Sequence, residues 1–178
     1  MTGRLELIIG GMFSGKTTEL KRRITRAASI GKRVMIVNHS NDERYGKGKI
    51  ATHAKDEYPA ESYSQLYSVV SSDLTEIDVI AIDEGQFFPD LREGVQQLVC
   101  MGKLVILASL NGDSDMKSFG QVHELVCFAD EIHHLTALCA VCGSTDIPGP
   151  FTKRISDEKG QLLVGGKERY YSVCRKHY

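Results

Sequence analysis

The chain has 178 residues, enough for one globular domain or for one domain with a small stapled appendage. Hydrophobic residues make up 42% and charged residues 25%, which are ordinary values for folded proteins and exclude a disordered chain. The 22 Lys and Arg against 23 Asp and Glu give a net charge of -1, which disfavours binding of nucleic acid through bulk positive charge. No apolar run reaches the roughly 20 residues of a membrane helix, and we see no signal-peptide cleavage pattern. Five cysteines favour metal binding or free thiols over a disulfide framework, so we expect a soluble, cytoplasmic protein.

The hydrophobic pattern predicts a β-α-β unit at the start of the chain. Residues 5–9 form a short apolar run typical of a buried strand, and residues 16–30 have helical periodicity that stops near Gly31. Residues 33–38 form a second apolar strand. Because such units normally close onto a parallel sheet, the pattern indicates an α/β fold.

The middle of the chain continues this alternation after a polar interval. Residues 41–64 carry few large aliphatic side chains, and we expect a long mobile loop there. Near-continuous apolar runs at 78–83 and 103–108 predict strands covered on both faces, with a helix at 91–101 between them and a further strand at 131–136.

After residue 137 the composition changes to Gly, Pro and Ser with isolated apolar pieces. About 40 residues cannot bury enough apolar surface to be stable unaided. We therefore divide the chain into a nucleotide-binding α/β domain, 1–137, and a second, stapled domain, 138–178.

The sequence GGMFSGKT fits the phosphate-loop pattern G-x-x-x-x-G-K-[ST], between a predicted strand and a predicted helix. Glycines let the backbone amides surround phosphate groups, and the helix N-terminus adds partial positive charge. Lys16 can reach the β- and γ-phosphates, and the Thr17 hydroxyl can bind Mg²⁺. A chance match in a Gly-rich turn is the alternative. The predicted nucleotide-binding residues are Gly10, Gly11, Met12, Phe13, Ser14, Gly15, Lys16 and Thr17.

An apolar strand that ends in Asp83 and Glu84 is typical of the acidic half of such a site. Asp83 would lie at the carboxyl edge of the sheet and hold Mg²⁺, directly or through water. Glu84 would face the terminal phosphate and accept a proton from an attacking hydroxyl or water. The alternative is a strand that simply ends in solvated acids.

Two ligand pairs, C-x-x-C and C-x-x-H, bound the last part of the chain. Three thiolates and an imidazole suit a closed, structural Zn²⁺ site. A redox C-x-x-C or unrelated thiols are the alternatives, and the gap between the pairs exceeds the usual spacing. The predicted ligands are Cys139, Cys142, Cys174 and His177. We expect Cys100 and Cys127, which lie in apolar stretches, to be buried, and Arg22, Arg23 and Arg26 to form a solvated helix face.

Taken together, the motifs resemble the type II thymidine kinases. The resemblance rests on GGMFSGKTTEL, NDERY, DEGQFFPD, the C-x-x-C, Thr152-Lys153-Arg154 and the segment 164–173 before C-x-x-H, and it covers nearly the whole chain. It implies a P-loop, RecA-like parallel sheet flanked by helices, followed by a small zinc-ribbon-like domain with a lasso loop. It also implies transfer of the γ-phosphoryl of ATP, with Mg²⁺, to the 5′-hydroxyl of thymidine or deoxyuridine, inhibition by dTTP, and a homotetramer.

The resemblance assigns residues to roles as well. It makes Glu84 the general base, and it places Asp42 and Arg44 near the phosphates. It places the nucleoside against Met12, Phe87, Leu110, Ser114, Thr152 and Tyr170, and against the lasso residues Gln161, Leu162, Leu163, Val164 and Gly165.

The sequence departs from the family pattern at a few positions. Gly11 stands where the family usually has Pro, and Gln161 replaces a residue that is commonly apolar. Ser114 stands where the family usually has a phenylalanine that stacks on the base. This last change removes aromatic contact area from the predicted pocket.

Two further functions fit a phosphate loop. One is an ATPase whose zinc ribbon grips nucleic acid, against which stand the near-neutral charge and the lack of a second nucleotide-binding half. The other is a non-catalytic nucleotide switch, against which stand the positioned Glu84 and the lack of an N-K-x-D guanine signature.

Overall fold

The computed structural model describes residues 2–41, 49–51, 57–155 and 169–178. In chain order its elements are β1 (Arg4–Gly10), α1 (Lys16–Ser29), β2 (Val34–His39), β3 (Lys49–Ala51), β4 (Glu57–Pro59), β5 (Glu61–Tyr63), α2 (Leu66–Val70), β6 (Val79–Asp83), the 3₁₀ helix η1 (Gly85–Phe87), α3 (Leu91–Cys100), β7 (Leu104–Leu110), η2 (Val122–Leu125), β8 (Glu131–Leu135), β9 (Ala137–Leu138), β10 (Pro148–Gly149), β11 (Phe151–Arg154), β12 (Tyr170–Val173) and η3 (Arg175–His177).

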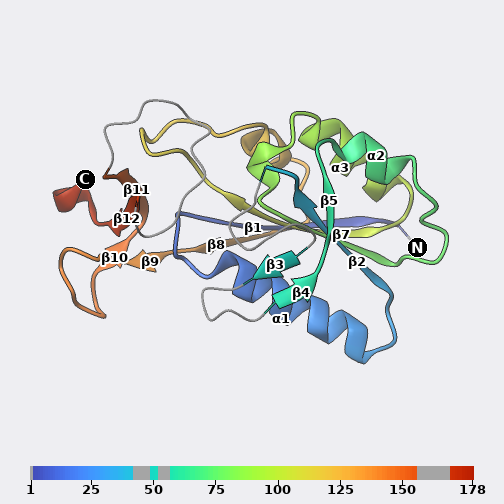
Figure 1. The fold of residues 1–178 in the computed structure, drawn as a ribbon, viewed down its shortest axis with the longest axis horizontal. Helices are drawn as coiled ribbons and strands as arrows, with labels where there is room; N and C mark the ends of the chain where they lie inside the picture. The colour runs from blue at the N-terminus through green and yellow to red at the C-terminus, as the bar shows by residue number, and fades with distance from the viewer. Residues whose placement is uncertain (1, 42–48, 52–56, 156–168) are drawn as a thin grey trace.

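A six-stranded parallel sheet organises the first part of the chain, in the order β5-β2-β6-β7-β1-β8. Helix α1 covers one face, and α2 and α3 cover the other (Figure 1). The predicted strands and helices of the sheet are all present, and the α/β prediction is confirmed. Strand β7 lies between β1 and β6, so the strands that carry the two predicted motifs are not neighbours.

Both faces of the sheet are buried at the central strands β6 and β7, which explains why these two strands have no polar alternation. In β6, Ile80 and Ile82 pack into the apolar cluster beneath α2 and α3, whereas Val79 and Ala81 pack beneath α1. Strand β7 repeats this alternation. The apolar side chains of α1 lie on one side of the helix and pack against one face of the sheet, as their helical spacing predicts.

The expectation of a loop over 41–64 is wrong in its described part. Strands β3 and β4 pair antiparallel, and β5 joins the main sheet beside β2. Each of these strands has three residues, too few for a periodicity to be seen in the sequence.

Arg23 is not on a solvated face, since only 8% of its side chain is exposed. It contacts Glu6 of β1, and it lies 2.9 Å from Glu19 and 3.0 Å from Glu131 of β8. These ion pairs fasten α1 to two strands of the sheet. The expectation of buried Cys100 and Cys127 is wrong too, because both residues are exposed, Cys100 at the end of α3 and Cys127 in the turn after η2.

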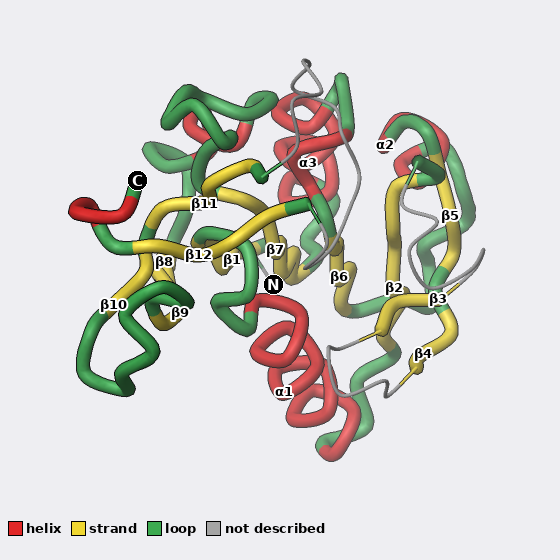
Figure 2. Tube along the Cα trace, turned by 60° about the vertical axis from the view of Figure 1, so that its left-hand side comes forward, coloured by secondary structure: helices red, strands yellow, loops and turns green. Residues whose placement is uncertain are grey.

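Beyond β8 the chain forms two small antiparallel pairs, β9 with β10 and β11 with β12. They lie at the end of the sheet where β1 leads into α1 (Figure 2). The domain boundary at residues 137 and 138 stays a prediction. In the described part of the chain, no helix combines the length and the apolar character that a membrane crossing requires.

Candidate functional site

The phosphate loop joins the carboxyl end of β1 to the start of α1. Phe13 and Gly15 both have left-handed backbone, with φ of 63° and 86°, so the chain turns sharply before Lys16. The Gly11 carbonyl oxygen accepts hydrogen bonds from Ser14 Oγ and Lys16 Nζ, both at 2.8 Å. Lys16 is 9% exposed and its side chain folds back over the loop. The predicted residues thus form a tight loop, and the Lys16 ammonium group is held against a carbonyl of that loop.

Asp83 at the end of β6 and Thr17 in α1 meet although β6 and β1, the strand before the phosphate loop, are not adjacent. Thr17 Oγ1 donates to Asp83 Oδ2 at 3.0 Å, and Asp83 Oδ1 accepts the Glu84 N–H at 3.0 Å. Asp83 is 5% exposed, so it is not a solvated strand end. A hydroxyl and a carboxylate side by side are oxygen ligands of the kind that Mg²⁺ prefers, so the pair fits this ion.

Glu84 opens the turn after β6 in left-handed conformation, with φ 54° and ψ 41°. For a residue other than glycine, this conformation costs on the order of 1–3 kcal/mol and is typical of functional sites. Glu84 Oε2 accepts a hydrogen bond from Gln86 Nε2 at 2.5 Å. Gly85 allows the close approach to β7, because a Cβ there would lie 2.3 Å from Leu107 Cδ1. The turn therefore holds the predicted general base at the carboxyl edge of the sheet.

The residues predicted to line the nucleoside pocket come from two parts of the fold. Phe87 follows β6, with its ring centroid 5.6 Å from that of Phe119 in an edge-to-face arrangement. Thr152 on β11 is buried, and its Oγ1 accepts the Met12 N–H at 3.0 Å. The small strands therefore contact the phosphate loop directly.

Three more of these pocket residues are described. Leu110 ends β7 and Tyr170, 5% exposed, begins β12. Ser114 is half-buried, and its carbonyl oxygen accepts the Tyr178 hydroxyl at 2.6 Å. Asp42, Arg44, Gln161, Leu162, Leu163, Val164 and Gly165 lie outside the described residues.

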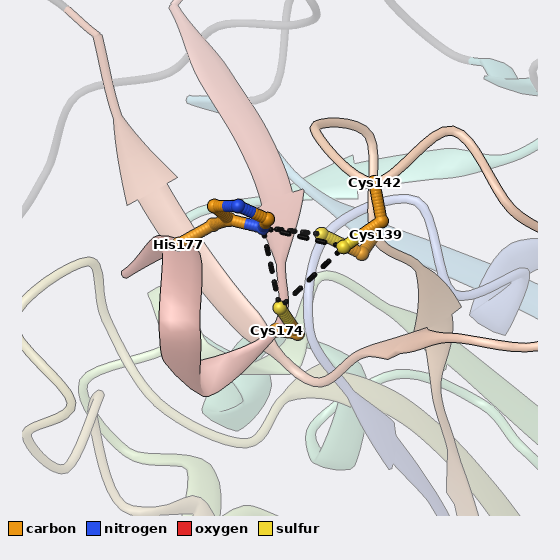
Figure 3. Close-up of side chains that lie close together, drawn as sticks. All are labelled: Cys139, Cys142, Cys174 and His177. Carbon is orange, nitrogen blue, oxygen red and sulfur yellow. Dashed lines mark hydrogen bonds between the residues drawn. The ribbon is translucent and has the colours of Figure 1, made fainter.

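The four predicted metal ligands converge (Figure 3), with all ligand atoms within 4.8 Å of one another. His177 Nδ1 lies 3.7 Å from Cys139 Sγ, 3.3 Å from Cys142 Sγ and 3.4 Å from Cys174 Sγ, and the last two sulfurs are 3.9 Å apart. A tetrahedral zinc ion, with ligands at about 2.0–2.3 Å, separates its ligand atoms by roughly 3.5–3.8 Å. The cluster therefore fits Zn²⁺.

Local backbone structure builds the two halves of this cluster. Cys139 and Cys142 lie in the turn after β9, where Gly143 has a φ of 61°, and Cys174 and His177 flank η3. Burial raises the pKa of the Cys139 thiol, but hydrogen bonds from the backbone at Cys174, Cys142 and Val141, with His177, bring it down to about 5. A thiol that ionises readily is suited to bind a metal.

Sequence reasoning missed the polar residues around Glu84. Gln86 is 3% exposed and Ser109 is fully buried, and the two are hydrogen-bonded at 2.9 Å. The signal was present, because Gln86 lies inside the DEGQFFPD motif and Ser109 interrupts an otherwise apolar strand. The cap at Asp90 was also missed: its carboxylate accepts the Leu66 and Tyr67 N–H groups at the start of α2.

Comparison with known proteins identifies the family of this chain. The sequence profile of the family described as thymidine kinase matches residues 3–178. The thymidine kinase of Yaba monkey tumor virus is 42% identical over 178 residues, which cover 99% of this chain and 95% of the relative. Those of Vaccinia virus (strain Western Reserve) and Variola virus are each 40% identical over 176 residues, 99% of this chain and 97% of the relative. The chain therefore belongs to the thymidine kinase family.

Proposed function

We propose that the protein transfers the γ-phosphoryl group of ATP to the 5′-hydroxyl of thymidine and deoxyuridine, with Glu84 as the general base. The observation that carries this proposal is the strained turn at Glu84, whose backbone N–H donates to Asp83, which in turn contacts Thr17 of the phosphate loop. The family membership of the chain supports the choice of thymidine as substrate.

In this proposal the phosphate loop and the acids at the end of β6 have separate roles in binding ATP and in the transfer. The backbone N–H groups of residues 10–17 and the start of α1 bind the phosphates, and Lys16 offsets their charge. Thr17 and Asp83 would hold Mg²⁺, which neutralises charge on the transferred group when bound. Glu84 accepts the proton of the attacking hydroxyl. Asp42 and Arg44 would add polar contacts to the phosphates.

The nucleoside would bind against Met12, Phe87, Leu110, Ser114, Thr152 and Tyr170, with the backbone of 161–165 holding the base. The support for this pocket is the resemblance of these positions to the family, together with the contact of β11 with the phosphate loop. Backbone groups that match the N3–H and O4 of thymine leave buried groups unpaired against cytosine. We therefore propose that deoxycytidine is refused.

The C-terminal cluster would hold a structural Zn²⁺ through Cys139, Cys142, Cys174 and His177. The ion would staple the segment after residue 137 into a second domain, as the distances between the four ligand atoms support. Four protein ligands close the coordination sphere, so this site takes no part in the chemistry.

A homotetrameric assembly and inhibition by dTTP are finer proposals that rest on the family resemblance alone. We also propose a cytoplasmic location, from the cysteine content, and function without a nucleic acid or membrane partner, from the near-neutral charge and the shortness of the apolar runs. Light scattering and dTTP titration of the activity test the first two directly.

The substitution Glu84→Gln tests the assignment of the general base. We expect kcat to fall about 10²–10⁴-fold, because an amide cannot accept the proton, while the Kd for ATP stays within about twofold. Phosphorylated product from thymidine and ATP binding by calorimetry are the two measurements. Glu93→Gln, on an exposed position of α3, is the matched control and should leave both unchanged. Near-normal turnover of Glu84→Gln contradicts the proposal.

A further inference from the structure

Gln86 connects the proposed general base to the end of β7. Its Nε2 lies 2.5 Å from Glu84 Oε2, and its Oε1 accepts hydrogen bonds from Ser109 Oγ at 2.9 Å and from the Leu110 N–H at 3.1 Å. Only 3% of Gln86 is exposed, so water does not replace these partners. The side chain therefore bridges two neighbouring strand ends, β6 and β7, at the predicted active site.

The two bonds to β7 fix which way the Gln86 amide faces. A backbone N–H is only a donor, so the atom that Leu110 contacts must be the amide oxygen. The amide nitrogen then faces Glu84, and it can only donate. Glu84 Oε2 therefore accepts this bond, which ties one oxygen of the carboxylate to the Gln86 amide.

The backbone of Gln86 is held as firmly as its side chain. A Cβ on Gly120, whose φ is +57°, would lie 2.4 Å from the Gln86 carbonyl oxygen, so the loop that carries Ser114 packs directly on this residue. Glu84 itself stands in a left-handed turn. One oxygen of the Glu84 carboxylate is thus bound to Gln86, whose own position is fixed by packing and by hydrogen bonds.

We propose that Gln86 is a positioning residue for phosphoryl transfer: its amide N–H orients the Glu84 carboxylate toward the reacting hydroxyl. This inference rests on the proposed role of Glu84. Gln86 acts through Glu84 and does not touch the substrate, so its removal lowers kcat and leaves the KM values for ATP and thymidine nearly unchanged. Misplacement of a catalytic group by about 1 Å costs on the order of 10²-fold.

Two variants of Gln86 separate this role from a structural one. Gln86→Leu removes the bonds to both Glu84 and β7, and we expect kcat to fall about 10- to 100-fold. Gln86→Glu keeps an acceptor for Ser109 and Leu110, so the turn stays folded, but it sets a second carboxylate against Glu84. The matched control is Gln97→Leu, at an exposed position of α3, which should retain normal kcat.

The split between kcat and KM gives the signature. A residue that acts through Glu84 lowers kcat when it is changed and leaves the KM values for ATP and thymidine within about twofold of the wild type. Gln86→Glu keeps the acceptor toward β7 but loses the donor to Glu84, so its kcat should fall about as far as that of Gln86→Leu. Near-normal kcat of Gln86→Glu, or a rise in KM with kcat unchanged, overturns the inference.

A double-mutant cycle with Glu84→Gln completes the test. If Gln86 acts only through Glu84, Gln86→Leu causes no further loss of kcat in the Glu84→Gln background. An equal loss in both backgrounds overturns the inference and leaves the role of Glu84 intact, as does near-normal kcat of Gln86→Leu alone. Normal kcat of Glu84→Gln alone overturns the proposed role of Glu84 instead.

Discussion

The parallel sheet and the segment after β8 are stabilised by different means. Both large apolar clusters consist of residues from Leu5 to Leu135 in the described part of the chain. The later segment buries few apolar side chains, among them Ala137, Tyr170 and Val173, but it contains the cluster of three cysteines and one histidine. The sheet buries its apolar surface in these clusters, whereas we propose that the segment depends on a metal bound by its three cysteines and one histidine.

The two regions nevertheless contact each other at the phosphate loop and at the loop after β7. The Met12 N–H donates to Thr152 of β11, and the Tyr178 hydroxyl donates to Ser114 in the loop after β7. Tyr178 follows the ligand His177 directly in the chain. Loss of the metal should therefore reach the active site through these two contacts without unfolding the sheet.

Loss of the metal has the largest expected effect. Cys139→Ser, or a strong chelator, should remove the zinc and unfold the segment, since zinc binding of this kind contributes about 10–16 kcal/mol. Elemental analysis should find one zinc per wild-type chain, and hydrogen exchange should show loss of protection in β11 and β12 but not in β6 and β7. Cys127→Ser, an exposed cysteine outside the cluster, is the control. A fully folded Cys139→Ser protein would contradict the comparison.

A substitution in the core of the sheet should lower the stability of the protein without changing its metal content. Leu98→Ala removes a fully buried side chain of α3, and we expect the free energy of unfolding to fall by about 2–5 kcal/mol while the zinc content stays the same. Urea denaturation measures the loss. The control is Leu138→Ala, at a position 52% exposed, where the loss should be much smaller. Equal losses at the two positions would show that the regions do not differ as proposed.

The smallest effect concerns the loop at Ser114, where the two regions touch. Ser114→Phe restores an aromatic ring at the predicted base-stacking position, and such contacts contribute roughly 0.5–1.5 kcal/mol beyond area burial. The KM for thymidine should therefore fall about 2- to 12-fold. Ser114→Ala tests removal of the hydroxyl alone and should change KM less than twofold. A rise in KM with Ser114→Phe would place the nucleoside pocket elsewhere.

The predictions from sequence succeeded where one local pattern decides the structure. The strand ending at Gly10, the helix from Lys16 and the strand ending at Asp83 follow from apolar runs next to motifs. The convergence of the three cysteines and His177 followed from their spacing and chemistry, whereas their role as zinc ligands stays a prediction.

The errors came where distant partners decide the structure. Arg23 has the spacing of a solvated residue, but carboxylates on β1 and β8 surround it. The three-residue strand β5 forms because β2 offers it an edge. The bonds of Gln86 to Ser109 and Leu110 form because β6 and β7 are neighbours in the sheet, and this strand order cannot be read from the sequence.

ATP consumption with different acceptors tests the central claim most directly. The same protein is assayed with ATP and Mg²⁺ alone, with thymidine, with deoxycytidine and with single-stranded DNA, and phosphorylated nucleoside is quantified alongside ADP. If the chain is a thymidine kinase with the site described, thymidine alone among these stimulates turnover, and one dTMP forms for each ADP. Stimulation by single-stranded DNA, or equal phosphorylation of deoxycytidine, would contradict the account.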